Sequence, residues 1–370
     1  MRPHRSGFRL ALLALAMLSL AVGVLAGLAR LGWNVPTPAA AASGWHGALM
    51  ISCFFGAVIS LERAVAIGRG WAYLAPAAAG LGGAALLAGA PLVVAQLLAL
   101  TAAAILVAAS MLVLQRLVAP FTLVLALAAA CWLAGNIAWL GSGSAISAVP
   151  FWLGFLVLTI AAERLELTRF LPTPRAAQHL FHLIVASILL GAAATFWREA
   201  AGLAWFSASL LALALWLLRY DIARHNARQR GLVRFIAICL LSGYGWLLLA
   251  GLLGMAGGLV VGHAWRDATL HAVALGFVFS MIFGHTPIIF PAVAQVKIPY
   301  HAYFYLPLIA LHATLALRIA GSLGDNFALR QAAGMGNAVV LLLFIATMLF
   351  SIVRGKRRQP GAARSVQART

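Results

Sequence analysis

The chain has 370 residues, of which 64% are hydrophobic and only 9% are charged. A composition this apolar excludes a soluble globular protein and predicts a polytopic helical membrane protein. The formal net charge of +19 could suggest a nucleic-acid partner, but the basic residues lie at the ends of apolar runs, where they orient spans in a bilayer. We therefore expect a lipid bilayer as the surroundings and no nucleic acid as a partner.

Twelve apolar segments are long enough to cross a bilayer as helices. Their predicted bounds are 8–31, 44–67, 71–90, 92–116, 119–141, 146–167, 178–196, 201–220, 231–256, 266–293, 302–321 and 328–353. Because the connections are mostly short, the sequence predicts an all-α protein with one integral membrane domain over residues 1–358. Residues 359–370 are polar and are expected to form a disordered tail.

The placement of the arginines predicts the orientation of these spans. With the N-terminus in the cytoplasm, inner segments carry clusters such as Arg224, Arg228 and Arg230, whereas outer loops carry single arginines such as Arg30. This bias alternates through all twelve predicted spans, as the positive-inside rule requires. We therefore expect both termini in the cytoplasm. The first span has the basic start of a signal peptide, but its apolar run is longer than a signal core, so we expect it to be retained.

The second span carries His46 near its predicted outer end. Met50 and Cys53 follow at i+4 and i+7, which places the three side chains on one face of an α-helix. Soft ligands in this pattern suit Cu(I), so copper is a candidate ligand of this stripe. Met and Cys on an apolar helix face also serve simply to pack, and that alternative stays open.

The tenth span carries His271 near one end and His285 near the other. Ionisable residues inside spans are rare and mark function by default. The second and tenth spans both run from outside to inside, so His46 and His271 lie at similar predicted depth. Two opposed imidazoles at one depth can coordinate one haem iron from both faces, and Arg266, in the turn above His271, could pair with haem propionates. The plainer alternative is two interfacial histidines satisfied by backbone and water.

A second group of histidines lies toward the predicted inner surface. His285 precedes Pro287, which removes a backbone donor and should loosen the helix. Irregular backbone inside a membrane lines a cavity rather than lipid, so we expect His285 to face a cavity near His179 or His182, at the start of the seventh span. These histidines are candidates for a second metal site or a proton path.

Glu62 and Glu163 each precede an arginine at the inner end of a span. Ion pairs with neighbouring arginines are one interpretation, and a proton path through the two carboxylates is the other. No nucleotide-binding loop, Ser-His-Asp arrangement or HExxH motif is present, so hydrolase chemistry has no support.

The histidine-bearing spans resemble those of known haem proteins. The stretches that carry the resemblance are Trp45-His46-Gly47 with Met50 and Phe54-Phe55, Leu270-His271 with Gly276, and Gly284-His285-Thr286. The first two resemble the second and tenth helices of haem–copper oxidase subunit I, whose second helix supplies a low-spin haem ligand. All three are similar to the NnrS family, which consists of twelve-span haem- and copper-containing membrane proteins linked to nitric oxide stress in denitrifying bacteria.

This resemblance implies a haem, of b type, at His46 and His271, with copper as a further candidate metal. It also implies a multi-pass protein of the bacterial inner membrane that acts with a redox partner in nitric oxide response or respiratory electron transfer. The oxidase motif His-Pro-Glu-Val-Tyr and the paired histidines of the oxidase copper site are absent, so oxygen reduction and proton pumping are not implied.

Two other classes of protein remain as alternatives. Twelve spans with both termini inside is also a common plan for a transporter or permease without a redox centre. Such a transporter should have interrupted helices at matched positions of two halves, whereas paired prolines occur clearly in the tenth span alone. A membrane assembly factor without a redox centre is the third class.

Overall fold

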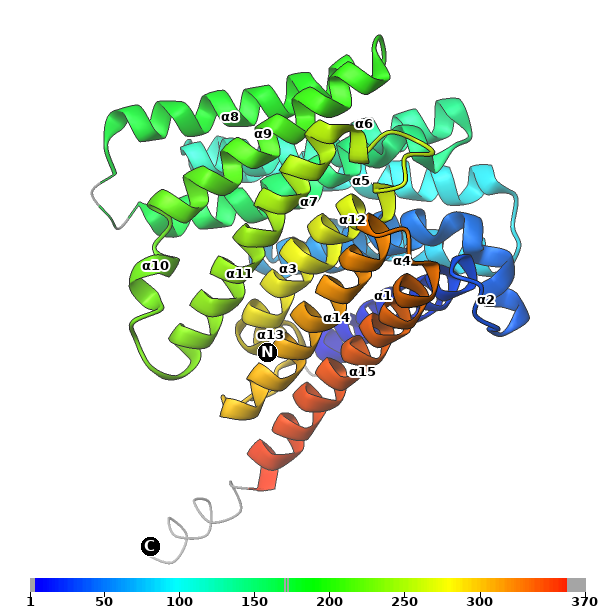
Figure 1. Ribbon diagram of the computed structural model, residues 1–370. Coiled ribbons are helices and arrows are strands. Elements are labelled where there is room, and N and C mark those ends of the chain that lie inside the picture. The colour runs from blue at the N-terminus through cyan, green and yellow to red at the C-terminus, as the bar shows by residue number, and fades with distance from the viewer. Residues whose placement is uncertain (1–3, 170, 172, 358–370) are drawn as a thin grey trace, which may run out of the picture.

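A computed structural model describes residues 4–169, 171 and 173–357, with side chains described over residues 7–355 of these ranges. All regular secondary structure in these ranges is helical, and twelve helices are long and apolar enough to cross a membrane (Figure 1). The prediction of an all-α protein with twelve spans is therefore confirmed. The predicted tail, 359–370, lies outside the described residues.

Each predicted span bound lies within four residues of the bound in the structure. The spans are α1 (His4–Arg30), η2 with α3 (Ala48–Phe55 and Gly56–Ile67), η3 with α4 (Gly70–Tyr73 and Leu74–Leu87), α5 (Leu92–Arg116), α6 (Pro120–Ser142), α7 (Ala145–Thr168), α8 (Arg175–Ala194), α9 (Glu199–Tyr220), α11 with η4 (Gly231–Leu253 and Gly254–Gly258), α12 with η5 and α13 (Arg266–His271, Ala272–Phe279 and Ser280–Ala294), η6 with α14 (Ala302–Phe304 and Tyr305–Leu323), and α15 (Phe327–Arg357). The short elements α2 (Thr37–Ala41), η1 (Ala42–Trp45) and α10 (Ala223–Asn226) lie in connections.

Consecutive spans pack as antiparallel neighbours, most extensively α6 with α7, α14 with α15, and α8 with α9. The sixth span, α7, is the most enclosed, because 72% of its most apolar window is buried, against 28% for α5. The second and tenth spans both contact α7 and α1. The interior of the bundle therefore lies between spans that are distant in sequence, and both cavities described below lie there.

The second and tenth spans share a feature that the sequence did not predict. Each contains a π-helical segment of eight residues, η2 in the second span and η5 in the tenth. π-Helical turns are wider than α-helical turns and are frequently found at functional sites. Each segment follows closely after a histidine, His46 or His271, so both side chains project from points where the helix changes its pitch.

The two prolines of the tenth span do not interrupt its helix, which corrects the sequence-based expectation. α13 continues through Pro287 and Pro291 and ends at Ala294, followed by Gln295 with a left-handed φ of 56°. Side chains supply donors in the same turn: Thr286 Oγ1 donates to the Ile282 carbonyl at 2.6 Å. The irregular backbone of this span therefore lies at η5 and at its end, not at the prolines.

The first and last spans lie side by side (Figure 1). Trp33 Nε1 donates to the Gln331 carbonyl at 3.2 Å, and Gln331 Nε2 donates to the Leu31 carbonyl at 2.8 Å. These two hydrogen bonds connect the end of α1 to the start of α15.

Candidate functional site

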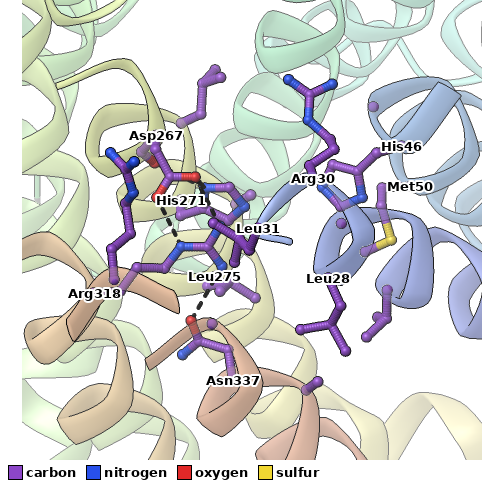
Figure 2. Close-up of a pocket in the computed structure, with 18 of the residues that line it drawn as sticks. Leu28, Arg30, Leu31, His46, Met50, Asp267, His271, Leu275, Arg318 and Asn337 are labelled. Carbon is purple, nitrogen blue, oxygen red and sulfur yellow. Dashed lines mark hydrogen bonds and ion pairs between the residues drawn. The ribbon is translucent and has the colours of Figure 1, made fainter. Parts of the chain in front are cut away.

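A cavity of about 410 Å³ lies at the end of the bundle where the second and tenth spans begin. Its walls come from α1, η2, α12, η5, α14 and α15, with a small part of α7. Figure 2 shows His46 beside Met50 on one wall, and His271 beside Asp267 and Arg318 on the other. We call this space the histidine cavity.

The two imidazoles form a near-parallel pair across the histidine cavity. The ring centroids of His46 and His271 lie 6.3 Å apart, and the ring planes differ by 22°. The expected approach of these two side chains, which are far apart in sequence, is therefore confirmed.

The backbone of α1 fixes the orientation of His46. Its Nδ1 lies 2.6 Å from the carbonyl oxygen of Gly23, and because a carbonyl only accepts, Nδ1 carries the proton. Two glycines bring the helices close enough for this bond: a Cβ at Gly27 would lie 2.8 Å from His46 Cε1, and one at Gly23 would lie 2.8 Å from Met50 Sδ. Small residues four apart let membrane helices approach in this way.

His271 is oriented by its own helix and by a carboxylate. Its Nδ1 donates to the Asp267 carbonyl at 2.8 Å and lies 3.3 Å from the Asp267 carboxylate. That carboxylate accepts two hydrogen bonds of 2.8 Å from Arg318. Asn337 Oδ1 accepts from Arg318 at 3.4 Å, and Asn337 donates to Thr314 at 2.8 Å. We call these four residues, Asp267, Arg318, Asn337 and Thr314, the Asp267 network; Figure 2 labels Asp267, Arg318 and Asn337.

The Nε2 atoms of both histidines therefore remain as acceptors. Within the described residues, neither Nε2 has a hydrogen-bond partner, and both side chains line the histidine cavity. His312 differs, because its Nδ1 accepts from Trp246 at 2.9 Å and its Nε2 contacts Ser242 at 2.9 Å. His312 is thus a structural histidine, whereas His46 and His271 have the donor pattern of metal-ligating histidines.

The geometry fits a metal that brings its own equatorial ligands. Two axial metal–nitrogen bonds of about 2 Å, with about 1 Å from each nitrogen to its ring centroid, put the centroids roughly 6 Å apart. The described residues contain no group of three or more His, Cys, Asp or Glu that could hold a bare ion. A porphyrin supplies four nitrogens, so two axial histidines suffice.

Arginines line the histidine cavity, but Arg266 is not among them. Arg266 donates instead to the Leu259 carbonyl. The cavity is lined by Arg30 of α1 and Arg330 of α15, besides the paired Arg318. Arg330 lies over the Phe327 ring, and its Nε is buried without a hydrogen-bond partner in the described part of the chain. Arg30 and Arg330 are therefore better placed than Arg266 to meet a carboxylate in the cavity, and only the packing of α1 and α15 puts them there.

The three side chains of the copper stripe predicted for the second span do not line one cavity. Met50 lines the histidine cavity, but Cys53 does not, and its Cβ would lie 3.2 Å from a Cβ at Gly83 of α4. The reason is the π-helical segment. Its turns contain more residues than α-helical turns, so seven residues no longer make two turns and the side chain at i+7 does not lie on the same face as the side chain at i.

A second, smaller cavity of about 160 Å³ contains Glu62, Glu163 and His285 among its lining residues. Its walls come from α1, η2, α3, α7, η5 and α13. His285 Nδ1 donates to the Met281 carbonyl at 2.8 Å, and Arg63 pairs with Glu163 at 3.3 Å. We call this space the glutamate cavity.

His179 and His182 do not join this group. His179 is exposed, and His182 is half-buried with its ring edge-on to Phe181. Neither lines the glutamate cavity. The expectation that His285 faces a cavity is confirmed, and the expectation that the histidines of α8 lie beside it is wrong, because α8 packs against α9 and α7 instead.

Fold and site together define a twelve-span helical membrane protein with a histidine pair in an interior cavity. The chain belongs to the family described as a domain of unknown function (DUF8744), which matches residues 9–353 and so includes both cavities. No curated protein matches the chain.

Proposed function

We propose that this chain is a haem-binding integral membrane protein, with His46 and His271 as the two axial ligands of a non-covalently held, b-type haem. The observation that carries the proposal is the hydrogen-bonding of the two imidazoles. Each gives its Nδ1 proton to a backbone carbonyl, and each keeps Nε2 free in the same cavity, at a ring separation that suits one metal between them.

The residues around the pair support this role. The Asp267 network holds the carboxylate beside His271 and neutralises its charge. Apolar side chains such as Leu31, Leu275 and Leu341 supply walls that suit a flat apolar ring. Arg30 and Arg330 could pair with the two carboxylates that a haem carries.

A haem with histidine at both axial positions supplies one-electron transfer. The physiological setting we propose is the bacterial cytoplasmic membrane, in nitric oxide response or respiratory electron transfer, with a redox partner protein. With both axial positions held by the protein, electron transfer is favoured over direct binding of a gas.

The visible absorption spectrum of the purified full-length protein tests the proposal. The reduced protein should have the split α and β bands of a low-spin haem, and His46→Ala or His271→Ala should abolish them because each removes one axial nitrogen. His312→Ala is the matched control: this histidine also lies in a span, but its bonds to Trp246 and Ser242 are structural, so the bands should persist.

Two results would overturn the proposal. The first is purified protein that neither contains haem nor takes it up on titration, which would favour the permease or assembly factor. The second is an unchanged spectrum in both histidine variants, which would place any haem elsewhere in the chain.

A further inference from the structure

The glutamate cavity contains more negative than positive charge. Glu62, Glu163 and His285 line it, and Arg63 pairs with Glu163 at 3.3 Å. Glu62 has no hydrogen-bond or ion-pair partner within the described residues. Two carboxylates against one guanidinium leave one negative charge unbalanced among apolar walls, and such a charge is costly to bury.

The other charged groups on the neighbouring helices do not line the glutamate cavity. Arg164 of α7 does not line the glutamate cavity and donates to Asp221 at 2.9 Å, with both side chains almost fully buried. On the same helix, Glu166 lies 3.9 Å from Arg169 at the surface. On α1, Arg9 lies over the Tyr73 ring, 5.8 Å from its centroid; its Nε has no hydrogen-bond partner in the described residues, and Arg9 does not line the glutamate cavity. In the described residues, neither Arg164 nor Arg9 forms a hydrogen bond or ion pair with Glu62.

The cavity also presents two acceptors without a donor. His285 Nδ1 donates to the Met281 carbonyl, so its Nε2 can only accept while the ring is neutral. An ionised Glu62 also only accepts. The two hydroxyls that line the cavity, those of Thr159 and Thr286, donate to carbonyls of their own helices. A proton held between these two acceptors would supply the donor that the lining residues lack.

We infer that the glutamate cavity is a proton-binding site, in which one proton is held by Glu62 and His285 while Arg63 balances Glu163. A proton supplies both the missing donor and the missing positive charge. A metal cation fits less well, because the described residues contain no group of three metal-ligating side chains, and hard cations need six or more oxygens. The site does not depend on whether the histidine cavity holds a haem.

Infrared spectroscopy of the purified full-length protein tests this inference. The sequence has only seven Asp and Glu residues, so carboxyl bands can be assigned by substitution. A protonated carboxyl band should be present at neutral pH and should shift in D₂O. Glu62→Gln should remove the band, and His285→Gln should shift its position because the imidazole is its proposed neighbour. Glu166→Gln is the control, since Glu166 is a surface carboxylate on the same helix as Glu163, and the band should be unchanged.

The inference is overturned if the wild-type protein has no protonated carboxyl band at neutral pH, a result that needs no variant to fold. It is also overturned if the band survives Glu62→Gln, or if sodium or zinc ions abolish the band in the wild type, which would identify a cation site. Gel-filtration profiles and melting temperatures of the variants check that loss of the band is not loss of the fold, and His285→Gln gives an independent readout if Glu62→Gln does not fold.

Discussion

At the residue scale, four histidines of the bundle fall into two groups according to the hydrogen-bond partners of their ring nitrogens. His46, His271 and His285 each donate to a backbone carbonyl and keep Nε2 free, whereas His312 uses both nitrogens for side-chain hydrogen bonds. A carbonyl cannot rotate away as a hydroxyl can, so the ring orientations of the first three are fixed by the helices themselves.

The Asp267 network leads to a prediction about stability. Asp267→Asn leaves Arg318, whose side chain is only 9% exposed, without its charged partner. Removing one member of a buried ion pair is costly, and because Asp267 is 25% exposed we expect a moderate loss of roughly 2 kcal/mol. Thermal unfolding of the full-length protein in detergent measures this loss.

A double-variant cycle provides the control for this prediction. Asp267→Asn combined with Arg318→Gln removes both charges, so the double variant should lose less stability than the two single losses added together. Strictly additive losses would show that the pair contributes no interaction energy.

At the scale of helices, hydropathy predicted the spans well, because the length of an apolar run is set by the thickness of the bilayer. It could not predict η2 or η5, since a π-helical segment is determined by packing against other spans and has no periodicity of its own in the sequence. For the same reason, Arg266 was selected by its closeness to His271 in the chain, whereas Arg30 and Arg330 reach the cavity from the first and last spans.

The contact of α1 with the second span gives a prediction at this scale. Gly27→Ala puts a Cβ about 2.8 Å from the His46 ring, which must then move. Displacing a ligand or its hydrogen-bond partner typically weakens metal binding by ten- to a hundredfold, so we expect haem affinity to fall by about tenfold or more. Haem titration followed by visible absorption measures the change.

Gly7→Ala is the matched control for this substitution. Gly7 lies on the same helix, and a Cβ there meets nothing within 4 Å. Its haem affinity should equal that of the wild type. Equal affinities for wild type, Gly7→Ala and Gly27→Ala would mean that the position of His46 does not depend on the close approach of α1.

At the scale of the whole molecule, we expect the two ends of the chain on one side of a membrane, because twelve candidate spans, if all cross, make an even number of crossings. The arginine bias predicts that this side is the cytoplasm. Reporter fusions after Gly143 and after Arg228 should therefore read outside and inside, respectively. Reversed signals would mean that the termini lie outside the cytoplasm. Equal signals at the two positions would contradict the predicted number of spans between them.

The whole-molecule view also places the two cavities along one pair of spans, with Phe55 lining both. Phe279 packs against Phe54 and Phe55, at centroid distances of 6.3 Å and 5.4 Å, so an aromatic partition separates the cavities. The sequence could identify a histidine at each end of the tenth span, but the partition depends on side chains from two spans meeting.

The separation of the two cavities determines how strongly a charge in one affects binding in the other. His271 and His285 are fourteen residues apart, which is roughly 20 Å along a helix at about 1.5 Å per residue. Two unit charges at that separation, in a medium of effective dielectric constant near 20, interact by about 0.8 kcal/mol. By reciprocal linkage, an electron gained in the histidine cavity would strengthen proton binding in the glutamate cavity by roughly fourfold, and a bound proton would favour the electron by the same factor. Each cavity would therefore alter the binding affinity of the other. Because the effect is only about fourfold, an electron could still be gained without a proton being bound, and a proton could be bound without an electron being gained.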